Sequence, residues 1–377
     1  MRDLSKWEGC ALPNASVLDG RFVRLERLTA ADHGDGLYDC STMPDAAERF
    51  RWLPEFPPRN RAEFQTWLDK AEASRDPLYY AIIDKASGKV AGRQTLLRID
   101  AANGVVEIGH VLWSSLMARK PAATEAFYLL ARHVFDDLGY RRFEWKCNDH
   151  NEPSKRAAIR FGMVAEGVFR QAAVVKGANR DTAWFSMIDG EWPMTRASFE
   201  TWLAPKNFDE TGHQRTPLST LNARQLIANG LKLHRVGLEA QSTVETLQAL
   251  SYARTRNLIG AEPIPLEWDY REILAECEVW VFDRENKPAG ALILRRREDD
   301  LYVESIATMP AVAGYGYGRA MMAAAFNRAE TLRLPKVRLM TNTLNPALDW
   351  YRRLGFVVEG EETLGDRKAL HMVAAVA

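Results

Sequence analysis

The second half of the chain repeats the first, and this duplication limits the fold more than any other feature. Predicted strands and helices in residues 15–190 return in the same order in residues 228–377, with landmarks such as Gly162 and Gly355 about 195 residues apart. A repeat of this length indicates two copies of one domain rather than an array of short units. We therefore predict a first domain over residues 1–195, a linker over 196–217 and a second domain over 218–377.

Each predicted domain is an α/β (α+β) arrangement. In the first half, strands are predicted at 21–28, 79–84, 89–99, 105–113, 143–147 and 182–188, with helices at 30–38, 62–74, 121–138 and 152–161. In the second half, strands are predicted at 231–236, 278–283, 288–294, 301–308, 336–341 and 368–374, with helices at 243–254, 269–275, 319–332 and 347–354. Short polar turns join three consecutive strands in each half, so most of each sheet should be antiparallel.

A glycine-rich loop follows one of the predicted strands of the second half. Gly314, Gly316 and Gly318 alternate with tyrosines, and a good helix former begins at Arg319. Glycine leaves no Cβ in the way of a ligand, and the first amides of a helix are unpaired and partly positive. Such a loop can bind a phosphate or a diphosphate, although it can also be a simple tight turn. Arg319 stands where the dinucleotide-binding pattern GxGxxG needs its last glycine, which argues against a Rossmann domain.

The composition excludes several classes of function. Lys+Arg and Asp+Glu both number 50, so no global field attracts nucleic acid or an acidic membrane. The four cysteines are far apart, which predicts neither a disulfide framework nor a metal site and fits a reducing cytoplasm. No apolar run is long enough for a signal peptide or a membrane span. A homodimer is compatible with the sequence.

The order strand, glycine loop, helix, strand, Asn, helix, Gly-Phe resembles the GNAT superfamily of N-acetyltransferases. The resemblance covers both halves and implies two tandem GNAT folds. In each, a mixed, mostly antiparallel twisted sheet flanked by helices splays between its fourth and fifth strands. It also implies that acetyl-CoA binds in the opening, with its pantetheine arm between the strands and its diphosphate on the loop. The expected acceptor is a primary amine on a small molecule or at a peptide or protein N-terminus.

The second half resembles the family closely at the loop. The resemblance implies that CoA contacts the strand at Ile306 and Thr308 and the loop at Ala313, Gly314, Tyr315, Gly316, Tyr317, Gly318 and Arg319. Ala313 replaces the family's usual basic or amide residue. A later motif, residues 345–356, places Asn345 at the cofactor, although its spacing to Tyr351 is one residue short and Asn342 is a substitute.

The first half resembles the branch that acetylates ribosomal-protein N-termini. Residues Ala123-Thr124-Glu125-Ala126 and Asn151-Glu152-Pro153-Ser154 are similar to that branch. Arg119 and Pro121 stand where the family has glycines. Either Arg119 and Lys120 bind the diphosphate through their side chains, or this half binds CoA poorly and serves as a structural or substrate-reading partner. The implied cofactor residues here are Arg119, Lys120, Ala122, Ala123, Thr124 and Asn151.

Acetyl transfer needs a base for the amine and an acid for the leaving thiolate. The resemblance implies that Glu304 is the base and Tyr351 the acid in the second half; the alternatives are a solvent-facing glutamate and a core tyrosine. In the first half Ala158 stands where Tyr351 would be, and Glu107, His110 and Ser154 are candidate replacements. We expect direct attack by the amine, because neither predicted site contains a cysteine. Asp45, Glu48 and Glu55 near Trp52 either attract a cationic amine or are solvated helix residues.

Three functional hypotheses follow. The first is a tandem acetyl-CoA-dependent N-acetyltransferase. The second is a CoA-binding scaffold or sensor that transfers nothing. The third has one catalytic domain and one domain that reads the substrate.

Overall fold

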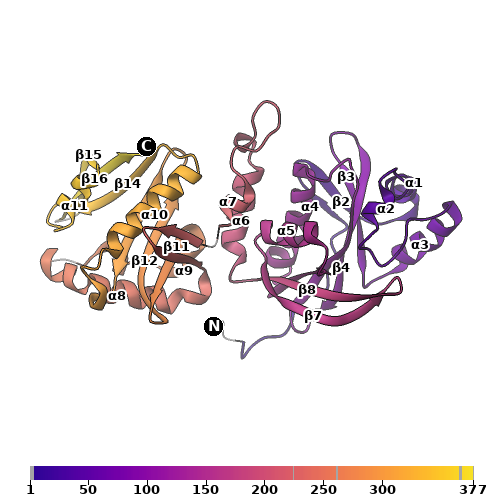
Figure 1. Cartoon of the computed structure of the whole chain (residues 1–377), viewed down its shortest axis with the longest axis horizontal. Coiled ribbons are helices and arrows are strands. Elements are labelled where there is room, and N and C mark those ends of the chain that lie inside the picture. The colour runs from indigo at the N-terminus through magenta and orange to yellow at the C-terminus, as the bar shows by residue number, and fades with distance from the viewer. Residues whose placement is uncertain (1–3, 224, 260–261, 365–366, 377) are drawn as a thin grey trace. The chain divides into compact units, whose positions relative to one another are not determined.

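The computed structural model describes residues 4–223, 225–259, 262–364 and 367–376. Within them the chain separates into two units, one ending at Pro205 and one beginning at Lys206, which we call the N-terminal unit and the C-terminal unit (Figure 1). Residues 196–203, which we expected in a linker, form most of a helix, α6, that belongs to the N-terminal unit.

The N-terminal unit is built on one sheet of eight strands in the order β1-β2-β3-β4-β5-β6-β8-β7. Only the β5–β6 pair is parallel. The strands are β1 (Val17–Asp19), β2 (Val23–Arg27), β3 (Leu78–Asp84), β4 (Lys89–Asp100), β5 (Val105–Trp113), β6 (Arg142–Asn148), β7 (Val164–Val175) and β8 (Ala178–Ile188).

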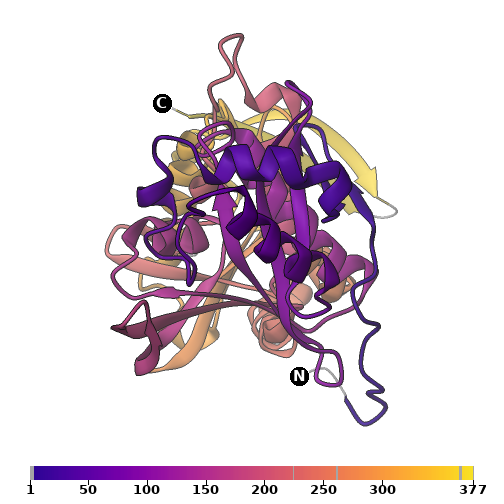
Figure 2. The same ribbon diagram turned by 90° about the vertical axis from the view of Figure 1, so that its right-hand side faces the viewer.

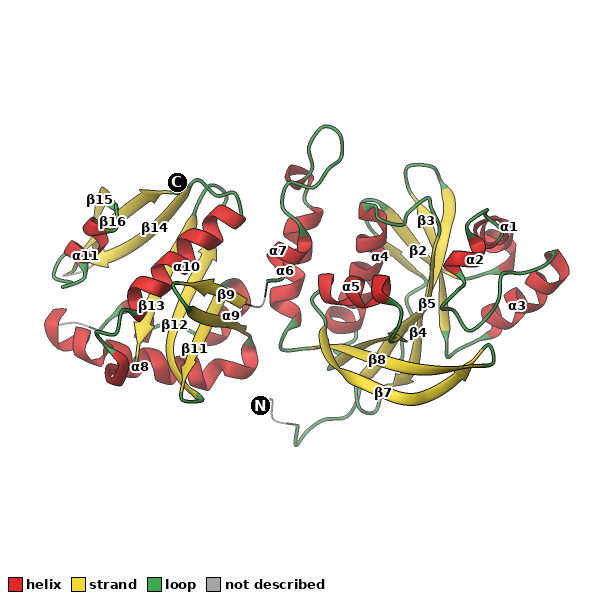
Figure 3. Cartoon of the chain, viewed as in Figure 1, coloured by secondary structure: helices red, strands yellow, loops and turns green. Residues whose placement is uncertain are grey.

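Helices cover both faces of this sheet. The helices are α1 (Ala30–Ser41), α2 (Ala46–Arg49), α3 (Arg61–Ala73), α4 (Pro121–Arg132), α5 (Glu152–Arg160) and α6 (Trp192–Leu203). Helices α1 and α3 lie on one face, and α4 and α6 on the other (Figure 3); Figure 2 shows the indigo helices in front of the sheet. Side-chain caps fix two helix starts: Asn60 accepts from the Glu63 amide at 2.9 Å before α3, and Asn151 from the Ser154 amide at 3.2 Å before α5.

The C-terminal unit repeats this topology in a second eight-stranded sheet, in the order β15-β16-β14-β13-β12-β11-β10-β9. Among its described strand pairs, β13–β14 is the parallel one. The strands are β9 (Gln225–Ala228), β10 (Leu231–Val236), β11 (Glu278–Arg284), β12 (Lys287–Arg296), β13 (Leu301–Thr308), β14 (Lys336–Asn342), β15 (Val357–Leu364) and β16 (Arg367–Ala375). The helices are α7 (Leu218–Leu221), α8 (Gln241–Ile259), α9 (Tyr270–Glu276), α10 (Tyr317–Thr331) and α11 (Leu348–Arg353).

In the C-terminal unit, helices pack on both faces of the sheet. Helices α8 and α9 pack Leu247 and Ile273 against Val281 and Ile293 of the sheet. On the opposite face, α10 buries Arg328, whose guanidinium donates to both carboxylate oxygens of Glu278 at 2.6 and 2.8 Å. This topology confirms two mixed, mostly antiparallel sheets flanked by helices.

The sequence pattern missed several strands. The largest are β7 and β15, and the predicted strand 182–188 is only the end of β8. Strand β7 lies at the edge of its sheet, and most of its residues are exposed on both faces. A strand with no buried face has no need to alternate apolar and polar residues, so the period-two signal is absent.

Candidate active sites

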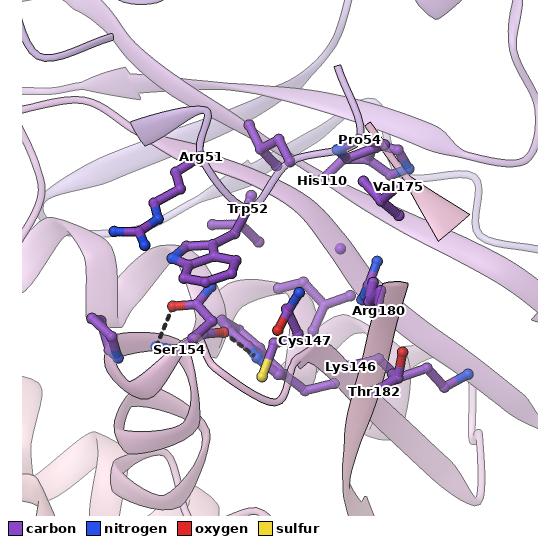
Figure 4. Close-up of a pocket in the computed structure, with 18 of the residues that line it drawn as sticks. Arg51, Trp52, Pro54, His110, Lys146, Cys147, Ser154, Val175, Arg180 and Thr182 are labelled. Atoms are coloured by element: carbon purple, nitrogen blue, oxygen red, sulfur yellow. Dashed lines mark hydrogen bonds between the residues drawn. The ribbon is translucent and has the colours of Figure 1, made fainter. Parts of the chain in front are cut away.

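The parallel strand pair of the N-terminal unit parts after four residue pairs. Strand β5 pairs with β6 from Val105 opposite Arg142 to Ile108 opposite Trp145. Both strands continue beyond that point, to Trp113 and Asn148, without pairing with each other in the described structure. A cavity of about 1230 Å³, which we call the N-terminal cavity, occupies the opening and extends to β8 and to the segment 45–54 (Figure 4).

Four of the predicted N-terminal site residues line this cavity: Glu107, Arg119, Asn151 and Ser154. The others do not lie in its described lining. Lys120 is exposed at the start of α4, whereas Ala122 and Ala123 are buried. The hydroxyl of Thr124 is also buried and accepts from Arg160 at 2.8 Å.

The carboxylate of Glu107 is already neutralised by protein. Lys146 Nζ lies 2.8 Å from Glu107 Oε2, and Arg98 donates to the same oxygen at 2.6 Å. Lys146 also lies 2.7 Å from Glu144. Oε2 of Glu107 therefore already has two cationic partners within the protein.

Ser154 lies at the start of α5 beside the cavity. Its hydroxyl oxygen accepts from the Trp145 indole at 2.9 Å and can still donate its own proton. One turn later, Ala158 is fully buried, so the N-terminal unit has no hydroxyl at the position that corresponds to Tyr351.

The loop before α4 keeps the backbone shape expected of a glycine without having one. Arg119 has φ of +63°, and Gly316, which precedes α10, has φ of +83°. The Ala123 amide donates to the Lys120 carbonyl at 3.2 Å. The amides of Arg119 and Ala122 have no acceptor among the described residues. Pro121 has no N–H to offer.

A bulge on β5 turns His110 toward the cavity. His110 and Val111 together stand opposite Gln94 of β4, and His110 has φ of +46°. Burial lowers the pKa of His110, although the nearby Glu55 carboxylate opposes the shift. Glu55 itself pairs with Arg93. Asp45 pairs with Arg49 through Oδ2, while its buried Oδ1 has no hydrogen-bond partner among the described residues.

Cys147 corrects one expectation, because it lines the N-terminal cavity. Cys147 is 5% exposed, and burial raises the pKa of its thiol. A thiol with a raised pKa is a poor nucleophile at neutral pH. The sequence prediction that no cysteine reaches a site was therefore wrong, but the thiol is not activated for covalent chemistry.

The C-terminal unit has the same kind of opening. Strand β13 pairs with β14 only from Leu301 opposite Val337 to Val303 opposite Leu339. Beyond Val303, β13 still pairs with β12 on its other edge as far as Thr308. A cavity of about 180 Å³, the C-terminal cavity, lies in this opening between β13, β14, α8 and the segment 263–268.

The glycine loop lies directly after β13 and presents unpaired amides. No hydrogen bond in the described chain takes up the amides of Gly314, Tyr315, Gly316, Tyr317, Gly318 or Arg319. The next amide, that of Ala320, donates to the Gly316 carbonyl at 3.1 Å. A Cβ added at any of the three glycines would meet nothing within 4 Å. Six free amides at the N-terminus of a 15-residue helix fit a diphosphate.

Glu304 is the extra residue of a bulge on β13. Ile293 of β12 is opposite Ser305, and Leu294 is opposite Val303, so Glu304 has no partner in the register. Its side chain, 16% exposed, lines the C-terminal cavity. Oε1 accepts from Arg295 Nε at 2.6 Å, and Oε2 has no hydrogen bond in the described chain.

Tyr351 lines the same cavity, and burial raises the pKa of its phenol. No described residue accepts or donates a hydrogen bond at its hydroxyl. Tyr252 nearby is bonded to Ser305 at 3.1 Å, and Ser305 donates to Gln248 at 2.9 Å. The lining of the opening therefore contains the Tyr351 hydroxyl, which has no hydrogen bond to a described residue, and the Glu304 carboxylate, of which only Oε1 is hydrogen-bonded.

The other predicted C-terminal residues divide into two groups. Ile306 and Asn345 line the cavity, whereas Thr308 and the loop 313–319 lie outside its described lining. The side-chain amide of Asn345 is already hydrogen-bonded within the segment 341–347. Its Oδ1 accepts from the Ala347 amide at 2.9 Å, and its Nδ2 donates to Thr341 at 2.9 Å. Asn342 caps the Leu344 amide at 2.8 Å.

Within the residues that the structure describes, no cluster of three or more His, Cys, Asp or Glu side chains is arranged to hold a metal ion. No described helix has both the length and the apolar character needed to cross a membrane.

A sheet that parts between two parallel strands, beside a helix N-terminus with free amides, defines an acetyltransferase fold of the GNAT class. Comparison with known proteins agrees: residues 23–164 and residues 275–358 each match an acetyltransferase (GNAT) domain family. A crystal structure of a GCN5-related N-acetyltransferase from Brucella melitensis is 56% identical, covers 58% of this chain and 99% of its own, and superposes with a TM-score of 0.58.

Two curated relatives match shorter stretches. The uncharacterized N-acetyltransferase p20 of Bacillus licheniformis is 31% identical over 30% of this chain and 63% of its own length. A protein named ribosomal N-acetyltransferase YdaF, from Bacillus subtilis (strain 168), is 28% identical over 28% of this chain and 57% of its own. The chain thus spans about three fifths of the curated relatives that it matches. It belongs to the GCN5-related N-acetyltransferase (GNAT) family and carries two of its domains in tandem.

Proposed function

We propose that the chain is an acetyl-CoA-dependent N-acetyltransferase that moves an acetyl group to a primary amine by direct attack in a ternary complex. The observation that carries the proposal is the parting of the parallel strands in both units, each beside the N-terminus of a long helix. The acceptor is an amine on a small molecule or at a peptide or protein N-terminus, and the relative named for ribosomal acetylation makes ribosomal-protein N-termini one class to include.

Acetyl-CoA supplies an activated thioester, and the residues of the C-terminal unit fit it. The free amides of Gly314 to Arg319 would hold the diphosphate without help from a side chain at Ala313. The unpaired edge of β13 from Glu304 to Thr308 would run beside the pantetheine arm, where backbone amides can donate to a carbonyl oxygen.

Two side chains of the C-terminal cavity suit the proton transfers. An alkyl ammonium with pKa near ~10 must lose a proton before it attacks, and Glu304 can take that proton through Oε2, directly or through water. Arg295 holds the carboxylate in place through Oε1. Since burial raises its pKa, the Tyr351 phenol stays protonated and can give its proton to a leaving thiolate.

A specific observation favours a second role for the N-terminal unit, in which it binds acetyl-CoA or acceptor but does not transfer. Its carboxylate, Glu107, is held by Arg98 and Lys146, and Ala158 replaces the acid. Against this, the Ser154 hydroxyl has a proton that it can donate, although it also interacts with the Cys147 thiol, and the lowered pKa of His110 keeps its ring neutral. Arg119 is exposed at the loop and would hold a phosphate through its side chain.

The test is thiol release from acetyl-CoA over a panel of amines, paired with calorimetric titration of CoA. Glu304→Gln and Tyr351→Phe should each lower turnover at least tenfold and change the CoA dissociation constant less than about twofold, because neither side chain binds the diphosphate. Glu330→Gln, exposed on α10, and Tyr140→Phe, a buried tyrosine in the N-terminal unit, are the matched controls.

Several results would overturn parts of the proposal. Full turnover in both variants would remove the assigned roles of Glu304 and Tyr351. If Ser154→Ala abolishes turnover instead, the N-terminal unit is the transfer site. Heat of CoA binding without thiol release from any amine would favour a scaffold or sensor.

A further inference from the structure

The N-terminal cavity is positively charged although the whole chain is neutral. Its lining contains six cations and three carboxylates. Most of these charges cancel locally, because Asp45 pairs with Arg49 and Glu107 pairs with Arg98 and Lys146. The cations that remain without an ion pair in the described structure are Arg51, Arg119 and Arg180; the remaining carboxylate, Glu48, is exposed.

Arg180 is the most confined of the three. It lies on β8, and its Nε is buried with no hydrogen-bond partner among the described residues. Burial lowers the pKa of its guanidinium. The neighbouring carboxylate on the strand, Asp181, accepts instead from the Gln171 amide at 2.7 Å and from Asn179 at 2.9 Å. A buried guanidinium donor without an acceptor is costly, so a ligand oxygen would relieve it.

Strand geometry places Arg180 away from the proposed diphosphate loop. Trp145 of β6 packs on Phe127 of α4, with ring centroids 6.1 Å apart, so the next residue, Lys146, points to the opposite face. Lys146 is in register with Trp184 of β8, and its Nζ lies 3.6 Å from that ring's centroid. Arg180, Thr182 and Trp184 are alternate residues of β8 and all three line the cavity, so Arg180 shares that face.

The cavity beside Arg180 is suited to an organic ligand rather than to solvent alone. Phe169 stacks on Trp184 at 4.5 Å, and both line the cavity together with Trp52. Figure 4 shows Arg180 beside Cys147 and Thr182, with His110 and Val175 above it and Trp52 across the opening. The ligand that fits has an oxyanion for the guanidinium and an apolar body for the aromatic wall.

We propose that the N-terminal cavity selects a ligand that carries an oxyanion, a carboxylate or a phosphate, and that Arg180 binds this group on the face of the sheet opposite α4. The guanidinium fork suits both groups through two parallel N–H···O bonds. If transfer occurs in this unit, as the proposed function allows, the ligand is the acceptor, and Arg180 sets its specificity without touching acetyl-CoA. The uncharged analogue would leave Arg180 desolvated and unpaired, so it should be rejected.

The experiment compares paired amines that differ only in the anion. Alanyl-alanine is paired with its C-terminal amide, and O-phosphoethanolamine with ethanolamine, so that the carboxylate and phosphate sources are tested separately. Each is titrated calorimetrically against the full chain without acetyl-CoA and then assayed for thiol release. The variants are Arg180→Gln, Arg180→Lys and the matched control Arg170→Gln, an exposed cation on the same hairpin that lies outside the described cavity lining.

The anionic member of at least one pair should bind at least tenfold more tightly than its neutral partner. Arg180→Gln should remove this preference, a loss of about 10- to 100-fold, as expected for charge-assisted hydrogen bonds. Arg180→Lys should keep part of it, Arg170→Gln all of it, and CoA affinity should be unchanged in all three. Arg119→Gln should instead weaken CoA binding and leave the preference for the anionic ligand unchanged.

Three results would overturn the inference: no preference in the wild type for either pair, an undiminished preference in Arg180→Gln, or a matching loss of CoA affinity, which would assign Arg180 to the nucleotide. Anion-selective binding without thiol release from any amine would refute transfer at this site and leave the binding inference standing. Unchanged thermal midpoints of Arg180→Gln and Arg170→Gln exclude misfolding as the cause.

Discussion

Replacing Gly318 by valine separates the role of the glycine loop in binding from its role in folding. Gly318 is the second residue of α10, it lies outside the left-handed region, and an added Cβ meets nothing within 4 Å. The folded chain should therefore accept the side chain, with a change in unfolding free energy of no more than about 1 kcal/mol. Gly316 would be a poorer choice, because its φ of +83° adds a backbone strain of roughly 1–2 kcal/mol for any other residue.

The effect on CoA should be much larger than the effect on folding. The valine methyl groups would occupy the space in front of the free amides of residues 314–319, where the diphosphate is proposed to lie. Losing even one hydrogen bond to a charged phosphate costs about 1.5–3 kcal/mol, or roughly 10- to 150-fold in affinity.

Calorimetric titration of CoA into the full chain measures this loss, and Gly360→Val is the control, because Gly360 on β15 also has open space around it. If the N-terminal unit binds a second CoA, one binding step should disappear in Gly318→Val while the other stays. Equal affinities and equal step numbers in Gly318→Val and Gly360→Val would refute the assignment of the loop.

Four further outcomes are expected. Arg119→Gly should relieve left-handed strain and raise stability by about 0.5–1 kcal/mol in urea unfolding, while it weakens CoA binding by the N-terminal unit; a loss of stability would contradict the strain argument. Arg328→Met should destabilise the C-terminal unit by about 3–5 kcal/mol, because it leaves the buried Glu278 carboxylate without its partner. Burial alone would raise the pKa of Glu278, and Arg328 lowers it to about 2. Changing both Arg328 and Glu278 to methionine should destabilise the unit less than Arg328→Met alone. Since burial lowers the pKa of His110, the unfolded chain takes up its proton first, and stability should fall as pH drops below about 6.5; His110→Gln should flatten this dependence of the thermal midpoint. Cys147→Ser should keep at least half of the turnover, and mass spectrometry should find no acetyl thioester on Cys147; trapping one would contradict direct attack.

The duplicated architecture was predictable because it depends on local patterns. Apolar alternation located the central strands, and the alternating glycines at 314–318 located the loop and the helix after it. These signals survive in a single sequence because each is carried by neighbouring residues. Edge strands such as β7 left no such signal, since neither of their faces is buried.

Individual site residues could be predicted only where their spacing to a recognisable sequence motif determines their position. Glu304 was expected from its place before the glycine loop, Tyr351 from its spacing to Gly355-Phe356, and Ser154 from the segment 151–154. All three line the cavities. Three-dimensional information was needed for Glu107, whose carboxylate is neutralised by Arg98 from β4 and Lys146 from β6.

Arg180 and Cys147 carried no sequence signal at all. Each is an ordinary residue on a strand, and its role follows from which face of the sheet it occupies and what lies beside it. The positive φ of Arg119 is a similar case, because an arginine gives no local indication of a left-handed backbone.

A crystal structure of the full chain with CoA would test most directly whether the glycine loop and the gap beside β13 bind the cofactor. We predict a diphosphate within hydrogen-bond distance of the amides of residues 314–319. We also predict a pantetheine arm beside β13 from Glu304 to Thr308, in the gap that begins after Val303. CoA bound elsewhere, or a pantetheine arm that lies outside this gap, would contradict these predictions.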